Sequence, residues 1–259
     1  MNFNKVLFIF ASMANLSTIK VLGIDFINTS VKQVVNILKH GGLLVVPAAP
    51  ALINVKNDPD YYSALQNADV VIPDSGYMAL LWNTFHRRKI KRISGLEFLI
   101  SFFNDEEVKR SSELLLVDPR PTEAQHNLNY LKNTGFKITD DISYVAPMYK
   151  KNKIEDAELL NIIEHKKPKY IIINLGGGTQ EKLGAYLKKN LSYKPAIICT
   201  GAAIAFLTGQ QASIPNWGDK LFLGWLFRCI QNPKLYVPRY FKAFQLAVFM
   251  FRYGQQQPL

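Results

Sequence analysis

Residues 67–76 read NADVVIPDSG, and this short stretch decides the fold class. The apolar run Val70 to Ile72 predicts a buried strand, which Pro73 cannot continue and after which small residues turn the chain sharply. Asp74 is therefore expected at the carboxyl end of a strand, where open α/β sheets bind ligands. A carboxylate there suits a general base, because it accepts a proton from a nearby hydroxyl. It also suits the N-cap of a helix beginning near Tyr77, and this stretch alone favours the cap.

The rest of the chain alternates apolar runs with helical patterns. Strands are expected over residues 19–26, 43–46, 113–118, 142–146, 170–173 and 196–199. Helices are expected over residues 31–38, 51–67 with a break near Pro59, 77–85, 122–133 and 154–165, with Thr29 and Thr122 as caps. This alternation predicts an α/β fold with a mainly parallel, Rossmann-like sheet and helices on both faces.

Small residues follow two of the later expected strands. Gly176, Gly177 and Gly178 stand between the strand 170–173 and a helix, and Thr200 and Gly201 follow the strand 196–199. Glycine lets the backbone approach a ligand, and a helix N-terminus offers N–H groups to an anion. The triple glycine is neither a Walker motif nor a GxGxxG fingerprint, so by itself it is also typical of a simple tight turn.

Composition limits the class of protein. The 259 residues are 48% hydrophobic, which is enough for a sizeable core and excludes wholesale disorder. The formal charge of +11 predicts an anionic partner, namely a nucleotide phosphate, an acidic membrane surface or nucleic acid. Cys199 and Cys229 form neither a disulfide framework nor a metal-ligand spacing, which indicates a reducing compartment.

The two ends of the chain differ from its middle. Residues 5–14 weakly resemble a signal peptide, but the apolar run is too short to span a bilayer, so we expect an irregular extension or the tail of an overlong start. No other stretch reaches the roughly 20 apolar residues of a transmembrane helix. From residue 211 onward, six bases and one acid are interleaved with aromatic residues. Such helices suit an interfacial membrane anchor or nucleic-acid binding, and aromatic packing on the main domain is equally favoured.

Five stretches then stand in a characteristic order. They read ADVVIPD (68–74), KRISGLE (91–97), GGGTQEK (176–182), GAAIAFLTG (201–209), and PNW with LGWLFR (215–217 and 223–228). Together they resemble the WecG/TagA/CpsF family of bacterial glycosyltransferases, typified by N-acetylmannosaminyltransferases. The resemblance covers nearly the whole chain, from about Thr18 to Tyr253. It divides the chain into an N-terminal extension (1–17), an α/β catalytic domain (18–209) and a membrane-associating helical appendage (210–259).

The resemblance implies an inverting, metal-independent transfer, without a cofactor, from a UDP-sugar to a sugar on an undecaprenyl-diphosphate lipid. Such a reaction belongs to bacterial surface polysaccharide or exopolysaccharide synthesis. It implies a cytoplasmic enzyme, peripheral on the inner face of the plasma membrane, whose C-terminal tail meets the anionic lipid surface. The resemblance allows homo-oligomers. Nothing in the chain resembles a recognition helix or an RNP motif, so no nucleic-acid partner is expected.

The resemblance also assigns roles to single residues. Asp74 matches the catalytic base, and Arg92 matches an active-site arginine that pairs with a diphosphate. Gln180 matches a position in the donor pocket. The cradle for UDP is formed by Gly176, Gly177, Gly178, Thr200 and Gly201. The membrane-facing arginines of the appendage correspond to Arg228 and Arg239.

This chain departs from the family pattern at several positions. Pro47, Ala48 and Ala49 replace a segment that usually carries a threonine and an asparagine, so a hydroxyl and an amide are missing. Gly178 and Thr179 replace the usual proline and lysine, and acidic residues are missing at Ala205 and Gly224. These losses motivate an alternative hypothesis, a non-catalytic homologue that is a binding partner in a polysaccharide synthase complex. The retained Asp74 favours an active enzyme.

Overall fold

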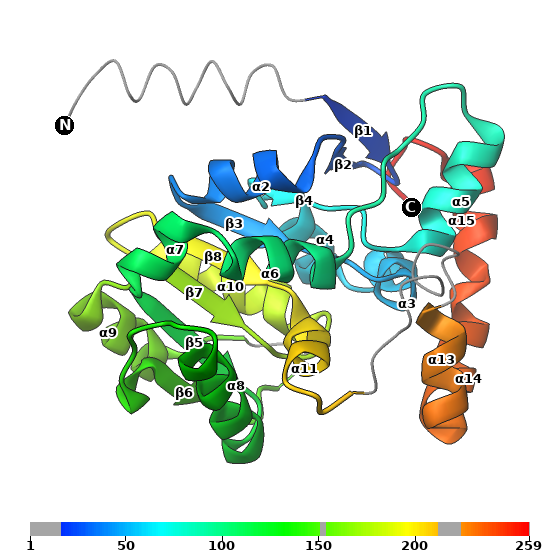
Figure 1. The fold of residues 1–259 in the computed structure, drawn as a ribbon. Helices are drawn as coiled ribbons and strands as arrows, with labels where there is room; N and C mark the ends of the chain where they lie inside the picture. Colours follow the sequence, from blue (N-terminus) through cyan, green and yellow to red (C-terminus); the bar gives the residue numbers. More distant parts are fainter. Residues whose placement is uncertain (1–16, 151–153, 212–223, 259) are drawn as a thin grey trace.

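The fold is built on a parallel sheet of six strands, β3 to β8, which are labelled in Figure 1. This computed structural model describes residues 17–150, 154–211 and 224–258. The strand order is β4-β3-β8-β7-β5-β6, and each neighbouring pair is parallel. The strands are β3 (Gly42–Val45), β4 (Val70–Val71), β5 (Leu114–Asp118), β6 (Ser143–Val145), β7 (Tyr170–Ile173) and β8 (Ala196–Cys199). The expected parallel sheet is confirmed.

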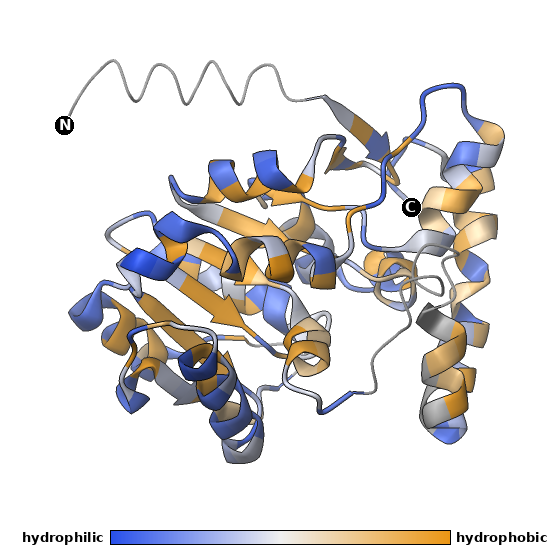
Figure 2. Cartoon of the chain, viewed as in Figure 1, coloured by the Kyte–Doolittle hydropathy of each residue, from blue (hydrophilic) through white to orange (hydrophobic). Residues whose placement is uncertain are grey.

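Helices cover both faces of this sheet, because its central strands are buried on both sides. The hydrophobic core on one face includes side chains of α4 (Pro59–Gln66), α9 (Ala157–Lys166) and α10 (Thr179–Asn190), and it continues into α5 (Gly76–Phe85) and α15 (Gln245–Tyr253). The other face packs on α2 (Val31–Leu38), α6 (Gly95–Phe103), α7 (Glu106–Ser111), α8 (Pro121–Asn133) and α11 (Ile204–Leu207). In β7, Ile171 and Ile173 belong to the first core and Tyr170 and Ile172 to the second. The apolar strands appear as an orange centre in Figure 2.

Several helix boundaries differ from the sequence expectations. The break expected near Pro59 is confirmed, because Asp58 caps α4 there, but the residues before it form the short α3 (Ala49–Leu52) and the 3₁₀ turn η1 (Ile53–Lys56) instead of one helix. Short 3₁₀ turns also occur at η2 (Asp140–Ile142) and η3 (Gly201–Ala203). Ser30 rather than Thr29 caps α2, and Arg120 rather than Thr122 precedes α8. Ser30 and Arg120 both have the extended backbone that is typical of an N-cap residue.

The first expected strand is in fact a hairpin outside the main sheet. Strands β1 (Thr18–Val21) and β2 (Ile24–Ile27) pair antiparallel. The turn of this hairpin meets the other end of the chain, since the Leu22 N–H donates to Gly254 O at 2.8 Å and the Gly23 N–H donates to Gln255 O at 3.0 Å. The N-terminal extension expected over residues 1–17 lies almost entirely outside the described residues.

The C-terminal part is helical, as expected. Helices α13 (Gly224–Gln231), α14 (Pro233–Ala243) and α15 stand beside the α/β unit, where α15 lies against α5 (Figure 1). The rings of Tyr77 and Phe244 meet edge to face, with their centroids 5.7 Å apart. None of the described helices is long and apolar enough to cross a membrane.

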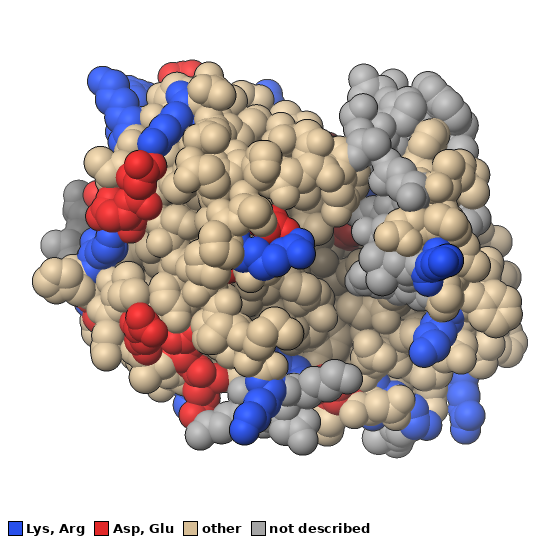
Figure 3. Space-filling view, turned by 90° about the horizontal axis from the view of Figure 1, so that it is seen from below, with Lys and Arg blue, Asp and Glu red and all other residues tan. Residues whose placement is uncertain are grey.

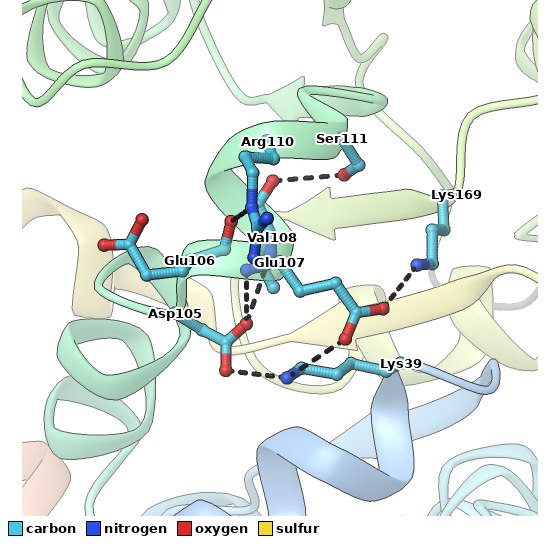
Figure 4. Close-up of polar contacts among 8 residues, drawn as sticks. All are labelled: Lys39, Asp105, Glu106, Glu107, Val108, Arg110, Ser111 and Lys169. Carbon is cyan, nitrogen blue, oxygen red and sulfur yellow. Dashed lines mark hydrogen bonds and ion pairs between the residues drawn. The ribbon is translucent and has the colours of Figure 1, made fainter.

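Charged residues join three segments at the amino ends of β3, β5 and β7 (Figure 4). The Lys39 Nζ lies 2.8 Å from Asp105 Oδ2 and 3.4 Å from Glu107 Oε2, and the Lys169 Nζ lies 3.2 Å from Glu107 Oε1. Asp105 also caps α7 through the backbone N–H of Val108. The Lys169 hydrogen bond lowers the pKa of Glu107. This network connects α2 and α7 to the start of β7. The cavity described below lies at the opposite, carboxyl ends of the strands.

Candidate functional site

A cavity of about 520 Å³ opens at the carboxyl ends of the strands. Seven of the ten residues predicted from the sequence line it: Asp74, Arg92, Gly176, Gly177, Gln180, Thr200 and Gly201. Figure 3 views the molecule from below and shows a hollow in this face, with basic and acidic side chains meeting at its rim. The topology explains the convergence, because the segments after β4, β7 and β8 leave the same edge of one sheet.

Asp74 is held in the cavity wall by the start of α6. Its Oδ1 accepts a hydrogen bond from the Gly95 N–H at 2.9 Å. Gly95 is the first residue of α6, so the carboxylate faces the positive end of a helix dipole. The N-cap of α5 is Ser75, whose Oγ accepts from the Met78 N–H at 3.1 Å. The alternative that Asp74 caps this helix is therefore wrong.

Arg92 is fixed to the same segment. Its Nε donates to the Asp74 carbonyl oxygen at 2.8 Å, and the Ile93 N–H donates to Pro73 O at 3.3 Å. These two bonds fasten the segment before α6 to the end of the β4 segment. The guanidinium and the Asp74 carboxylate consequently line one wall of the cavity.

Gln180 connects the two glycine segments. Its Oε1 accepts from the Gly201 N–H at 2.7 Å, and its Nε2 donates to Glu181 Oε1 at 3.0 Å. Gly201 has a φ of +59°, which glycine adopts without the cost of a Cβ. Both side chains are buried, and burial raises the pKa of Glu181 to about 6. The buried amide thus fixes the loop after β8 against the N-terminus of α10.

Gly178 does not line the cavity. It is the N-cap of α10, with a φ of +91°, and its N–H donates to Glu181 Oε2 at 2.6 Å. This N–H is already used within the fold. The neighbouring Gly176 and Gly177 remain part of the cavity wall, so the structure brings two of the three predicted glycines to the site.

A second polar cluster, formed by Asp118, Asn127 and Asn174, was not predicted from the sequence. Asp118 Oδ1 accepts from Asn127 Nδ2 and from Asn174 Nδ2, each at 2.7 Å. Burial raises the pKa of Asp118 to about 6, although both amide hydrogen bonds lower it. Asn127 and Asn174 line the cavity. The sequence did contain a signal for this cluster. Asp118 and Asn174 are polar residues at the carboxyl ends of β5 and β7, just as Asp74 is a polar residue that follows β4.

The profile of the glycosyl transferase WecG/TagA/CpsF family matches residues 19–258. The chain belongs to this family. It is also 21% identical over 230 residues to an N-acetylglucosaminyldiphosphoundecaprenol N-acetyl-beta-D-mannosaminyltransferase of Staphylococcus aureus (strain MW2), covering 85% of this chain and 87% of the relative. The enzyme of that name from strain MRSA252 is 22% identical over 227 residues, covering 84% and 86%. Membership makes the chain a glycosyltransferase, as the motifs predicted.

In this member of the WecG/TagA/CpsF family, the cavity wall beside β3 is apolar. It is formed by Val46, Ala48 and Ala51. Ala48 belongs to the segment in which the expected hydroxyl and amide are missing, so the sequence departure falls inside the cavity.

Two further predicted residues of this glycosyltransferase lie on the C-terminal helices. Arg228 belongs to α13 and Arg239 to α14, and their side chains lie outside the described part of the chain. The PNW motif, residues 215–217, lies wholly outside it. Their predicted roles therefore stay predictions.

Proposed function

We propose that this glycosyltransferase moves a sugar from a UDP-sugar to a sugar on an undecaprenyl-diphosphate lipid in surface polysaccharide synthesis. The single observation that carries the proposal is the carboxylate of Asp74, held by the Gly95 N–H in the wall of the cavity. The names of the Staphylococcus aureus relatives support the acceptor class, since those enzymes act on N-acetylglucosaminyldiphosphoundecaprenol.

The proposed transfer is a single, metal-independent displacement. Asp74 accepts the proton of the acceptor hydroxyl while that oxygen forms a bond to the anomeric carbon of the donor. The bond from the anomeric carbon to the phosphate oxygen breaks, and UDP leaves with the bonding electron pair. One displacement from the opposite side inverts the anomeric configuration. Arg92 lines the same cavity and carries a fixed positive charge, which suits the growing charge on the diphosphate.

The loops after β7 and β8 are the proposed seat of the diphosphate. Gly176, Gly177 and Gly201 line the cavity, and the lack of side chains allows an anion to approach the backbone. Thr200 lines the cavity beside Gly201, and its buried hydroxyl has no hydrogen-bond partner among the described residues. Gln180 orients this loop through Gly201.

The C-terminal helices are the proposed contact with the inner face of the plasma membrane. Phe241 and Phe244 are 74% and 57% exposed, and Phe251 on α15 is 91% exposed. The exposed bases Lys242 and Arg252 accompany them, and apolar side chains beside bases suit an anionic lipid surface. Arg228 and Arg239 would add to this surface. Such a peripheral position would bring the cavity to an acceptor that remains in the bilayer.

Release of UDP by purified protein tests the proposed function. The protein is mixed with liposomes that carry undecaprenyl-diphosphate-linked sugars and with a panel of UDP-sugars, beside an Asp74→Asn variant. We expect turnover with one donor, which the variant lacks, and product analysis should give the inverted anomer.

A second candidate function is a non-catalytic partner in a polysaccharide synthase complex. The apolar cavity wall at Ala48 and Ala51 favours it, because polar groups that would read a donor are missing there. It predicts measurable UDP binding with no turnover for any donor in the panel. Turnover by the wild-type protein would exclude it.

A further inference from the structure

Three buried oxygens of the Asp118 cluster, whose two asparagines line the cavity, lack a hydrogen-bond donor among the described residues. They are Asp118 Oδ2, Asn127 Oδ1 and Asn174 Oδ1, on side chains that are at most 7% exposed. A buried acceptor without a donor is costly, and native structures satisfy nearly all of them. Three such atoms in one cluster therefore indicate a missing partner.

The orientation of the two amides defines the chemistry of that partner. Both Nδ2 groups donate to Asp118 Oδ1, so the atoms left over are acceptors. A phosphate does not suit this cluster, because phosphate oxygens are also acceptors and carry negative charge. A group that donates two hydrogen bonds from neighbouring atoms suits it, and a vicinal diol is such a group.

The position of the cluster along the sheet indicates which diol. Asp74 follows β4, the glycine segments follow β8 and β7, and Asp118 ends β5, which is the order of the strands across the sheet. Four strand spacings of about 4.8 Å separate the Asp74 end from the Asp118 end by roughly 19 Å. A nucleotide-sugar has the same sequence of parts, with the sugar at one end, the diphosphate in the middle and the nucleoside at the other end.

We propose that Asn127 and Asn174 bind the ribose hydroxyls of the donor nucleotide, and that Asp118 positions both amides. The inference rests on the proposed function and deepens it by naming the residues that recognise the nucleoside. Asn127 and Asn174 contact the ligand, whereas Asp118 acts through them and is a positioning residue.

Calorimetric titration of the full-length wild-type protein with UDP and with 2′,3′-dideoxy-UDP is the first test. The two probes differ only in the ribose hydroxyls, so the comparison needs no variant. We expect the dideoxy compound to bind at least tenfold more weakly. Equal affinity for the two compounds would overturn the inference while leaving the proposed function intact.

Variants of the cluster test whether its residues cause the preference for UDP over 2′,3′-dideoxy-UDP. In Asn174→Ala and Asn127→Ala we expect UDP to bind about tenfold more weakly and the preference over dideoxy-UDP to fall below threefold. Asn129→Ala is the matched control, because Asn129 lies on α8 beside Asn127 but is exposed. Asp118→Asn should keep the preference, since an amide oxygen still accepts from both asparagines, and Asp118→Leu should lose it.

Three outcomes would overturn the assignment. If every variant keeps the wild-type preference, the ribose is recognised elsewhere and the cluster only holds a buried water. If the variants bind UDP normally but bind the UDP-sugar donor weakly, the cluster reads the sugar. If the wild-type protein binds no UDP at all, the proposed function fails together with the inference.

Discussion

The carboxylate of Asp74 and the backbone N–H of Gly95 lie 2.9 Å apart, although 21 positions separate them in the chain. This bond joins the end of the β4 segment to the first turn of α6. It fixes the direction of the Asp74 carboxylate. Together with the bonds from Arg92 Nε to Asp74 O and from the Ile93 N–H to Pro73 O, it joins two of the five family motifs.

We expect Asp74→Asn to lower transfer by a factor of 10² to 10⁴, which is the usual contribution of a general base. The amide oxygen of asparagine still accepts from Gly95, so the fold and UDP affinity should stay close to wild type. Initial rates of UDP release and calorimetric UDP binding measure the two effects separately. Wild-type rates in the variant would remove Asp74 from the mechanism.

Substitution Gln180→Leu should loosen the loop after β8. It removes the hydrogen bonds that Gln180 makes with the Gly201 N–H and with Glu181 Oε1, and each such loss costs about 1–3 kcal/mol. We expect a lower free energy of unfolding in urea and weaker UDP binding. Gln125→Leu is the control, because Gln125 is exposed on α8. Equal effects of the two substitutions would refute the role assigned to Gln180.

The pKa of Asp118 leads to a pH dependence of stability. Burial raises this pKa from 3.8 to about 6, so the folded protein binds more protons than the unfolded chain between these values. The free energy of unfolding therefore falls as the pH rises through this window. Asp118→Asn removes this contribution and should be more stable than wild type at pH 8 by about 3 kcal/mol.

The same comparison at pH 4 should show a much smaller difference between the two proteins. The buried Glu181, whose pKa is raised in the same direction, is present in both and cancels. Urea unfolding at the two pH values provides the measurement. A difference that does not depend on pH would mean that folding leaves the pKa of Asp118 unchanged.

Gly184 permits close packing of α10 on the sheet, and a side chain there should destabilise the fold. A Cβ at this position would lie 2.7 Å from Leu43 Cδ1 and 2.9 Å from Cys199 Sγ. We expect Gly184→Ala to lower the free energy of unfolding by about 1–3 kcal/mol, as overpacked cores do. The Leu43→Val change removes the contacting atom, so in a double-mutant cycle it should offset part of the loss. Simple additivity would argue against a steric cause.

Membrane binding through the appendage can be tested without measuring catalysis. The exposed Phe241 and Phe251 each gain about 1.5–3 kcal/mol when fully buried, so Phe241→Ser with Phe251→Ser should weaken binding to anionic liposomes more than tenfold. Met148→Ser is the control, because Met148 is 98% exposed near β6 on the α/β unit. Unchanged sedimentation of the double variant with liposomes would exclude these rings from the contact.

Much of the fold followed from local pattern. The β-branched run of β7 and the apolar run of β8 are buried on both faces, and such runs predict parallel strands directly. The pairing of strands was harder to predict. The first strand-like segment folds back on itself as the hairpin of β1 and β2, and the turn of this hairpin is bonded to Gly254 and Gln255 near the end of the chain. Contacts between such distant segments leave no local pattern in the sequence.

The site was predicted less completely than the fold. Motifs identified Asp74 and Gln180, but not the bond partners that orient them, since Gly95 and Gly201 act through backbone N–H groups. The Asp118 cluster was missed because Asn127 comes from the middle of α8, where a single asparagine resembles any surface residue. Only the three-dimensional arrangement shows that its amide reaches Asp118.

The hydrogen bonds from Leu22 to Gly254 and from Gly23 to Gln255 join the residues after the last helix to the hairpin near the start of the described chain. The C-terminal helices are therefore held in two ways: α14 packs on α3 and α15 packs on α5, and the residues after α15 are bonded to the turn of the N-terminal hairpin. Removal of the last few residues would break the bonds to Leu22 and Gly23 but keep the packing of α15 on α5. The two ends of the chain would separate, while the helices would keep their place on the α/β unit.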